Sequence, residues 1–252
     1  MFRELPHMGR PVAEGPGYDP EQDGFPTVRP KDAATLIIYR HGEDGLEVLL
    51  GERSAKHAFM PNRYVFPGGR VDREDWRVPV ASDLHPDVAA RLERAATPAR
   101  ARALALAAIR ETFEETGLII GRRLDTLPTA KLAKPKLPKD WQPFFDAGYA
   151  PAMDRIGYLC RAVTPPGRPR RFNARFLALA AEHAAGELKE SSELGSLRWM
   201  PVARAHELKI PRITEIVLNA MHETPPERMP SGRDAKVPLF KTVRGCHWFG
   251  WE

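Results

Sequence analysis

Three glutamates cluster in the stretch RETFEETGL, residues 110–118, near the middle of the chain. On an α-helix, which turns by about 100° per residue, Glu111, Glu114 and Glu115 share one face. Three carboxylates at this spacing repel one another unless solvent or a cation relieves the repulsion. Hard divalent cations such as Mg²⁺ and Mn²⁺ prefer carboxylate oxygens. The stretch therefore has two interpretations, a solvated acidic helix face or part of a metal site.

Two neighbouring features favour the metal site. Arg110 precedes Glu114 by one helical turn, so its guanidinium is placed to orient a carboxylate through charge-assisted hydrogen bonds. Upstream, VFPGG at residues 65–69 predicts a strand that ends in a tight turn. Glycines at this turn allow close backbone approach and can aim a carbonyl oxygen at a bound ion.

The elements that must position these residues follow from periodicity. Residues 99–116 form the strongest predicted helix, because Leu106, Ile109 and Phe113 fall on one apolar face and Gly117 supplies the stop. Further helices are predicted at 86–96 and 213–223, and strands at 34–40, 46–54, 155–165, 170–181 and 196–202. Strands and helices are mixed without regular alternation. The predicted fold class is therefore α/β (α+β), an α/β/α sandwich with a mixed β-sheet between helices.

Composition divides the chain into three predicted parts. Residues 1–31 are rich in Pro, Gly and charge and predict an irregular arm, 32–223 predict one domain, and 224–252 predict an irregular tail. The net charge of +5 is modest, and the arginines of 168–175 are not interleaved with aromatic residues, so no nucleic-acid partner is expected.

Other sequence features bear on the compartment. There is no apolar run of about 18 residues and no secretory leader pattern, so no membrane association is expected. The two cysteines, Cys160 and Cys246, show no metal-ligand spacing. Two isolated cysteines favour a reducing, cytoplasmic location.

The glutamate helix and the glycine turn together resemble the signature of the Nudix hydrolase family. That signature opens with a glycine, reaches a glutamate after a spacer, and ends with Arg-Glu-apolar-x-Glu-Glu-x-Gly-apolar. The residues that match its second half are Arg110, Glu111, Glu114, Glu115, Gly117 and Leu118, and Gly69 matches the opening glycine. Thr112 occupies the apolar position, with Phe113 beside it to take up the packing.

The first half of the signature is less regular in this chain. The first acidic position is Asp75 when counted from Gly69, or Glu74 when counted from Gly68. Residues 76–109 then separate it from Arg110, far more than the family pattern has. We infer an insertion at about 76–98. The sequence therefore assigns no role to Asp75 or Glu74, whereas the carboxylates of the helix are unaffected.

The resemblance implies hydrolysis of the pyrophosphate linkage in a small nucleoside diphosphate derivative, with Mg²⁺ or Mn²⁺ as the cofactor. It implies as metal ligands Glu111, Glu114, Glu115 and the Gly68 carbonyl, and as catalytic residues Arg110, Glu111, Glu115 and Glu193. A carboxylate accepts the proton of the attacking water. Glu111 of the box is one candidate for this base; on a later loop Glu193 is preferred over Glu190, although either is otherwise an ordinary surface glutamate.

The segment 49–69 resembles an accessory pattern of the coenzyme A-cleaving branch of this family. The residues that match are Leu49, Leu50, Arg53, Ser54, Phe66, Pro67, Gly68 and Gly69, and the departures are Gly51, Ala58 and Asn62. Ala58 replaces an arginine, for which Lys56, His57 or Arg63 is a substitute. The resulting substrate-binding candidates are Arg53, Ser54, Lys56, Arg63 and Gly69.

Several alternatives to a coenzyme A diphosphatase remain. In one alternative, Arg53 and Ser54 simply end a strand, and the substrate is NADH or ADP-ribose. A non-catalytic nucleotide-binding regulator of the same fold is a third reading, against which the intact glutamates argue. The resemblance also suggests a homodimer, because family members are often dimers.

Overall fold

The computed structural model describes residues 28–55, 60–127, 137–243 and 246–252. A large sheet contains β1 (Lys31–Gly42), β2 (Gly45–Arg53), β3 (Tyr64–Val65), β4 (Gly68–Arg70), β7 (Gly157–Val163), β8 (Phe172–Ala180), β9 (Leu194–Pro201), β10 (Pro238–Val243) and β11 (Cys246–Trp251). The main strand order is β11-β10-β7-β8-β1-β2-β3, while β4 pairs with β1 and β9 pairs with β2. The sheet is mixed, because β1 runs parallel to β8 and β10 parallel to β7, whereas the other pairs are antiparallel.

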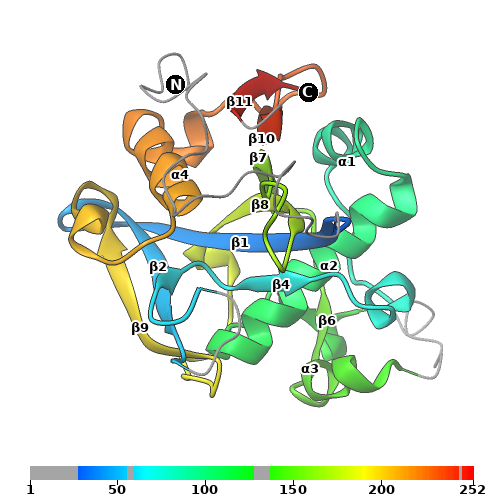
Figure 1. The fold of residues 1–252 in the computed structure, drawn as a ribbon. Helices are drawn as coiled ribbons and strands as arrows, with labels where there is room; N and C mark the ends of the chain where they lie inside the picture. The colour runs from blue at the N-terminus through cyan, green and yellow to red at the C-terminus, as the bar shows by residue number, and fades with distance from the viewer. Residues whose placement is uncertain (1–27, 56–59, 128–136, 244–245) are drawn as a thin grey trace.

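Helices cover both faces of this sheet (Figure 1). The helices are α1 (Pro86–Glu93), α2 (Pro98–Thr116), α3 (Gln142–Asp146) and α4 (Arg212–Glu223). The first two pack with the sheet in one hydrophobic cluster, and α4 packs with it in another. The predicted α/β/α sandwich with a mixed sheet is confirmed.

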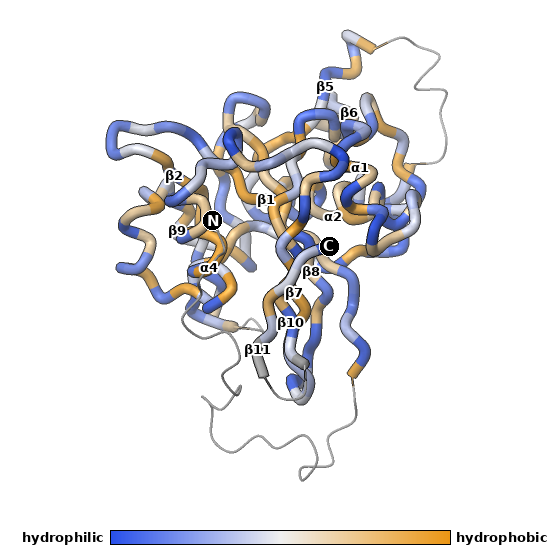
Figure 2. Tube along the Cα trace, turned by 90° about the horizontal axis from the view of Figure 1, so that it is seen from above, coloured by the Kyte–Doolittle hydropathy of each residue, from blue (hydrophilic) through white to orange (hydrophobic). Residues whose placement is uncertain are grey.

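The central strand β1 is buried on both faces, as a strand between two helical layers must be. Leu36 and Ile38 belong to the cluster on the α2 side, and Ile37 between them belongs to the cluster on the α4 side. Figure 2 shows hydrophobic stretches along β1, α2 and α4, with mostly hydrophilic loops around them. The sheet therefore holds two cores apart and fixes the face on which α2 lies.

Local signals set the ends of α2, which carries the glutamates. The side chain of Thr97 accepts a hydrogen bond from the N–H of Arg100 and caps the start of the helix. Gly117 ends it in the left-handed region, with φ of 74°. Leu106 and Ile109 are fully buried, as the periodicity predicts.

The prediction of an irregular tail at 224–252 is wrong for its last part, because β10 and β11 form a hairpin that joins the sheet through β7. The prolines and glycines of the tail dominate the local signal, whereas pairing with a distant strand decides the structure. Arg94, which follows α1 in the insertion, holds this segment, because its guanidinium donates to the backbone oxygens of Ala235 (3.0 Å) and Glu252 (2.8 Å). Of the predicted arm 1–31, residues 1–27 lie outside the described part, and Lys31 begins β1.

A smaller unit beside α2 was not predicted at all. It contains the two-stranded sheet of β5 (Gly121–Arg123) and β6 (Tyr149–Pro151), the 3₁₀ helix Lys139–Trp141, and α3. Trp141 and Phe144 are almost completely buried, and the ring of Phe144 meets that of Phe113 on α2 edge-on at 5.2 Å. This unit covers the side of α2 next to the glutamates.

Within the described residues, no helix combines the length and the apolar character that a membrane span requires.

Cys160 is expected to be chemically inert in the folded protein. It is completely buried on β7, and burial raises the pKa of its thiol, which disfavours the reactive thiolate. In the variant Cys246→Ser, no thiol should react with 5,5′-dithiobis(2-nitrobenzoate) until denaturant is added, when one thiol per chain should react. Rapid labelling of the native variant would contradict the buried position of Cys160.

Candidate active site

The structure brings the glycine turn and the glutamates of α2 together. The backbone N–H of Gly68 donates to Glu115 Oε2 at 2.8 Å. Gly69 lies so close to Glu111 that a Cβ at this position would stand 2.3 Å from the Oε1 atom. Glu115 is only 6% exposed and the side chain of Glu111 15%, whereas that of Glu114 is 43% exposed, so the part of the face next to the glycine turn is buried and its far edge is solvated.

Burial disfavours the ionised form of all three glutamates. It raises the pKa of Glu115 to about 8, with a contribution from Glu111 and against the hydrogen bond from Gly68. It raises the pKa of Glu114 to about 7 and that of Glu111 as well, in both cases against the favourable charge of Arg110. Carboxylates that are kept this close together and partly desolvated gain from a cation that neutralises them.

Arg110 is the internal cation of this group. Its Nη1 atom donates to Glu111 Oε1 at 2.9 Å and to Glu114 Oε2 at 3.2 Å. Burial by itself lowers the pKa of the guanidinium, but the hydrogen bonds that it donates to Asp75 and the charges of the neighbouring carboxylates outweigh burial and raise the pKa. Arg110 thus remains charged and donates hydrogen bonds to two of the glutamates.

Asp75 is the residue that the sequence did not assign. It is completely buried, and its carboxylate accepts hydrogen bonds from Nε (3.0 Å) and Nη2 (3.2 Å) of Arg110. The insertion, which contains α1, loops out and returns, so the two residues meet across it. The count from Gly69 was the signal that pointed to Asp75, whereas Glu74 accepts from the N–H of Asp140 instead.

The loop after β8 crosses from the end of α2 to the end of β2. At one end, the N–H of Lys189 donates to the carbonyl of Thr116 at 2.8 Å, and at the other the N–H of Ser54 donates to the carbonyl of Glu193 at 3.0 Å. Glu193 also lies close enough to raise the pKa of Glu115. The loop therefore places Glu193 beside the glutamates of α2.

Glu190, the alternative on the same loop, points elsewhere. One of its carboxylate oxygens accepts from the N–H of Leu197 at 3.3 Å, on β9. This contact holds Glu190 along the strand that follows, whereas Glu193 is electrostatically coupled to Glu115.

The substrate-binding candidates differ in their placement. Arg53 interacts electrostatically with the glutamates of the site. Burial lowers the pKa of its guanidinium, while the charges of Glu115, Glu111 and Glu193 oppose this shift. Ser54 and Gly69 adjoin the site through the contacts given above. Arg63 is exposed, and its carbonyl accepts from the N–H of Arg53 at 2.9 Å. Lys56 and His57 lie outside the described residues.

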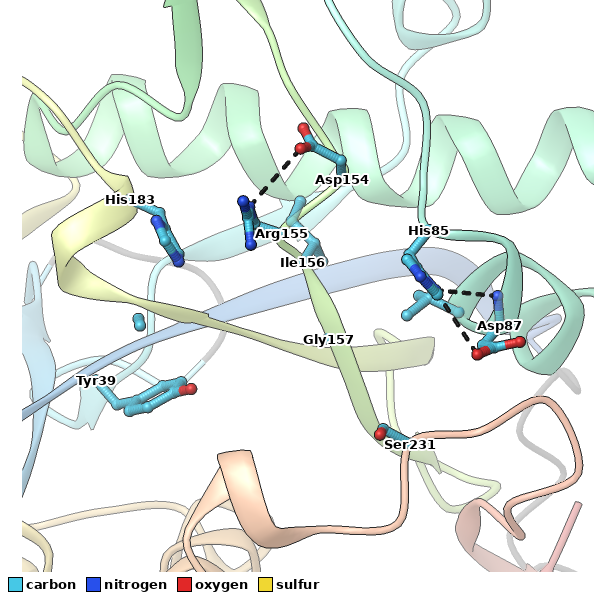
Figure 3. A pocket seen from close by; sticks show the side chains of 11 residues that line it. Tyr39, His85, Asp87, Asp154, Arg155, Ile156, Gly157, His183 and Ser231 are labelled. Carbon is cyan, nitrogen blue, oxygen red and sulfur yellow. Dashed lines mark hydrogen bonds and ion pairs between the residues drawn. The ribbon is translucent and has the colours of Figure 1, made fainter.

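A separate hollow of about 330 Å³ lies between the start of α1, the start of β7 and the turn after β8. Figure 3 shows that His85 and Asp87, Asp154 and Arg155, and Tyr39 and His183 line it from different sides. None of the predicted site residues is among its lining residues, and Asp154 is already paired with Ser82 and Arg122. This hollow is distinct from the candidate active site.

The donor set of the candidate site suits a hard divalent cation. Among the described residues, no three His, Cys, Asp or Glu side chains already surround a common cation position. Arg110 donates to Glu111 and Glu114, and the N–H of Gly68 donates to Glu115. The glutamates nevertheless offer only oxygen ligands, and their raised pKa values show the charge that a cation would relieve. On this chemistry the residues fit Mg²⁺ or Mn²⁺.

The two glycines of the turn should respond differently to alanine. At Gly69 the added Cβ meets only the carboxylate end of Glu111, which can move, so Gly69→Ala should fold normally and lose the orientation of Glu111. At Gly68, with φ of 150°, the Cβ meets the carbonyl oxygen of Ala34 at 2.5 Å, so Gly68→Ala should be destabilised by about 1–3 kcal/mol. Thermal unfolding of both variants checks this contrast, and equal losses of stability would contradict it.

Comparison with known proteins agrees with this geometry. No family model matches the chain. A Caenorhabditis elegans protein designated nudix hydrolase 7 is 27% identical over 158 residues, which make up 61% of this chain and 46% of that protein. The chain thus spans about half the length of this relative. A crystal structure of a Nudix hydrolase from Alicyclobacillus acidocaldarius is similar with a TM-score of 0.57 and 29% identity, over 79% of this chain and 94% of that chain.

The mixed sheet between helices matches the fold of the Alicyclobacillus acidocaldarius protein. Both proteins are designated Nudix hydrolases, the family that the sequence of this chain resembles. The coenzyme A-cleaving branch rests on the segment 49–69 alone, and we treat it as a proposal.

Proposed function

We propose that the chain hydrolyses the pyrophosphate linkage of a nucleoside diphosphate derivative in the presence of Mg²⁺ or Mn²⁺, with coenzyme A or an acyl-coenzyme A as the substrate. The observation that carries the proposal is the contact between the glycine turn and α2, where Gly68 meets Glu115 and Gly69 meets Glu111. It joins two segments that the resemblance treats as one motif, despite the insertion between them.

The residues that would hold the cation are Glu111, Glu114, Glu115 and the carbonyl of Gly68. When bound, the ion supplies screening of the pyrophosphate charge and a lower pKa for an attacking water. Arg110 keeps Glu111 and Glu114 directed toward the cation through its Nη1 atom. Arg110 is therefore a positioning residue in this proposal.

Glu193 is our candidate for the base that takes the proton of the attacking water. It lies on the loop that spans the site, and its charge acts on both Glu115 and Arg53. Glu111 is the alternative within the box, although its contact with Arg110 already occupies one of its oxygens. Glu193→Gln distinguishes them. If Glu193 is the base, this variant loses kcat but keeps the Mn²⁺ affinity of the parent protein, because Glu193 is not a proposed ligand; if Glu111 is the base, Glu193→Gln keeps kcat.

The choice of coenzyme A rests on the match of segment 49–69 and on the place of Arg53. This guanidinium lies beside the glutamates, so it is positioned to meet a phosphate of the substrate while the cation holds the pyrophosphate. NADH and ADP-ribose also contain a pyrophosphate and compete as substrates in the same site.

The test is a substrate panel with the full chain. Coenzyme A, acetyl-coenzyme A, NADH and ADP-ribose are each incubated with the protein and Mg²⁺ or Mn²⁺, and new phosphomonoesters are separated by chromatography. We expect coenzyme A and its thioester to be cleaved at the pyrophosphate, with no product in excess EDTA. No turnover of any of the four would refute the proposed reaction, and preferential cleavage of NADH or ADP-ribose would refute the assignment to coenzyme A.

A further inference from the structure

The carboxylate of Asp75 is surrounded by donors on every side. Its Oδ1 atom accepts from Arg110 Nε at 3.0 Å and from the indole Nε1 of Trp141 at 3.0 Å. Its Oδ2 atom accepts from Arg110 Nη2 at 3.2 Å and from the backbone N–H of Asp72 at 2.8 Å. These four hydrogen bonds use all the acceptor positions that a carboxylate has.

The indole of Trp141 comes from outside the residues that the family signature covers. It belongs to the 3₁₀ helix Lys139–Trp141 of the small unit beside α2, and it is completely buried. The ring of Phe144 meets it edge-on, with 5.4 Å between the centroids. The indole thus packs against an aromatic ring, and its single donor is directed at Asp75.

We propose that Trp141 is a positioning residue of the metal site, an inference that rests on the proposed function. Two of the three guanidinium nitrogens of Arg110 are bound by Asp75, so the direction of Asp75 decides where the third points. That third atom, Nη1, is the one that donates to Glu111 and Glu114. Trp141 fixes the carboxylate plane of Asp75, and through Arg110 it fixes these two glutamates.

The indole N–H of a tryptophan can fix the carboxylate of Asp75 because this carboxylate is buried and all its acceptor positions are used. If the indole N–H is removed, Oδ1 of Asp75 loses one of its two donors in a place where water does not replace it easily. The carboxylate can then turn about its Cβ–Cγ bond, and the guanidinium with it. Groups that hold a ligand in this way influence metal affinity even though they never touch the metal.

The test compares two variants that differ in chemistry but share the same aromatic cluster. Trp141→Phe removes the N–H and keeps a ring, whereas Phe144→Leu removes ring packing and leaves the four hydrogen bonds of Asp75 intact. Mn²⁺ affinity is measured by calorimetry on the full-length variants without substrate. We expect Trp141→Phe to bind Mn²⁺ about tenfold more weakly than the parent protein, and Phe144→Leu to bind it within about twofold.

An unchanged Mn²⁺ affinity of Trp141→Phe, or an equal loss in both variants, would overturn the inference, because Trp141 would then act through packing alone. The Mn²⁺ affinity of the parent protein distinguishes a failure of this inference from a failure of the proposed function. If it binds no Mn²⁺, the metal-dependent function is refuted and the inference with it; if it binds Mn²⁺ and Trp141→Phe binds equally well, only the inference fails.

A second measurement needs no variant and applies if Trp141→Phe does not fold. In ¹⁵N-labelled parent protein, the indole N–H of Trp141 should exchange slowly with solvent, and its resonance should shift when Mg²⁺ is added. The indoles of Trp76 and Trp248, whose residues are 42% and 38% exposed, serve as references. If the indole resonance of Trp141 does not shift at saturating Mg²⁺, the inference is overturned.

Discussion

Glu115→Gln is expected to lower kcat for pyrophosphate hydrolysis by about 10²- to 10⁴-fold while the protein remains folded. Glutamine has the same shape, and its carbonyl oxygen can still accept from the N–H of Gly68, as Glu115 does at 2.8 Å. The change therefore removes a charge from the proposed cation site and little else. Steady-state kinetics with saturating Mg²⁺, together with circular dichroism, measure the two halves of this expectation.

The matched control is Glu182→Gln, because the side chain of Glu182 is 79% exposed and pairs with His183, which is not a residue of the candidate site. This variant should keep kcat within about twofold of the parent value. If Glu115→Gln retained comparable activity, the assignment of Glu115 to the site would be wrong, whatever the substrate.

The variant Glu115→Gln should also be more stable than the parent protein when metal is absent. The folded-state pKa of Glu115 is raised from 4.5 to about 8, so the folded parent loses stability as the pH rises through this interval, in which the unfolded chain is already ionised. Glutamine has no such loss. The melting temperature of Glu115→Gln in EDTA should therefore exceed that of the parent by a margin that grows from pH 5 to pH 8, and a constant or shrinking margin would contradict the sign.

The second large effect is expected for Asp75→Asn, which should lower the free energy of unfolding by about 3–5 kcal/mol. Asparagine leaves the charge of Arg110, a residue only 4% exposed, without its bidentate partner. One of the asparagine polar atoms is also a donor that faces the N–H groups around it. Urea denaturation monitored by fluorescence gives the change directly.

Asp72→Asn provides the comparison for this loss. Asp72 is also close to Arg110, but its carboxylate lies 3.8 Å from Nη2 and is 29% exposed. Its contribution should stay below about 1 kcal/mol, as for other partly solvated pairs. Equal losses in the two variants would mean that the bidentate geometry of Asp75 carries no special weight.

The parts of the fold that sequence predicted well are those whose signals are local. Helix α2 is bounded by a capping threonine and a glycine, and its apolar period is regular, so its observed range, Pro98–Thr116, is within one residue of the prediction. By contrast, β10 follows a proline-rich stretch and is a strand because it pairs with β7. Such long-range pairing leaves no periodic trace in the segment itself.

The candidate site divides in the same way. The glutamates of α2 and the glycine turn were recognisable because each has a short pattern of its own. Asp75 was visible only as one of two possible counts, since nothing local shows that the chain returns to it after the insertion. Trp141 had no signal at all, because its role depends on the direction of a single N–H bond in a segment that is otherwise rich in breakers.

The contact between Arg94 and the carbonyls of Ala235 and Glu252 couples two lengths of chain that look independent in the sequence. The insertion after Asp75 and the strands β10 and β11 are each an addition to the part of the fold that carries the glutamates. Because a side chain of the first addition satisfies backbone groups of the second, shortening either one alone leaves the other with unpaired polar groups. The two are best regarded as one structural module, to be kept or removed together when this scaffold is redesigned.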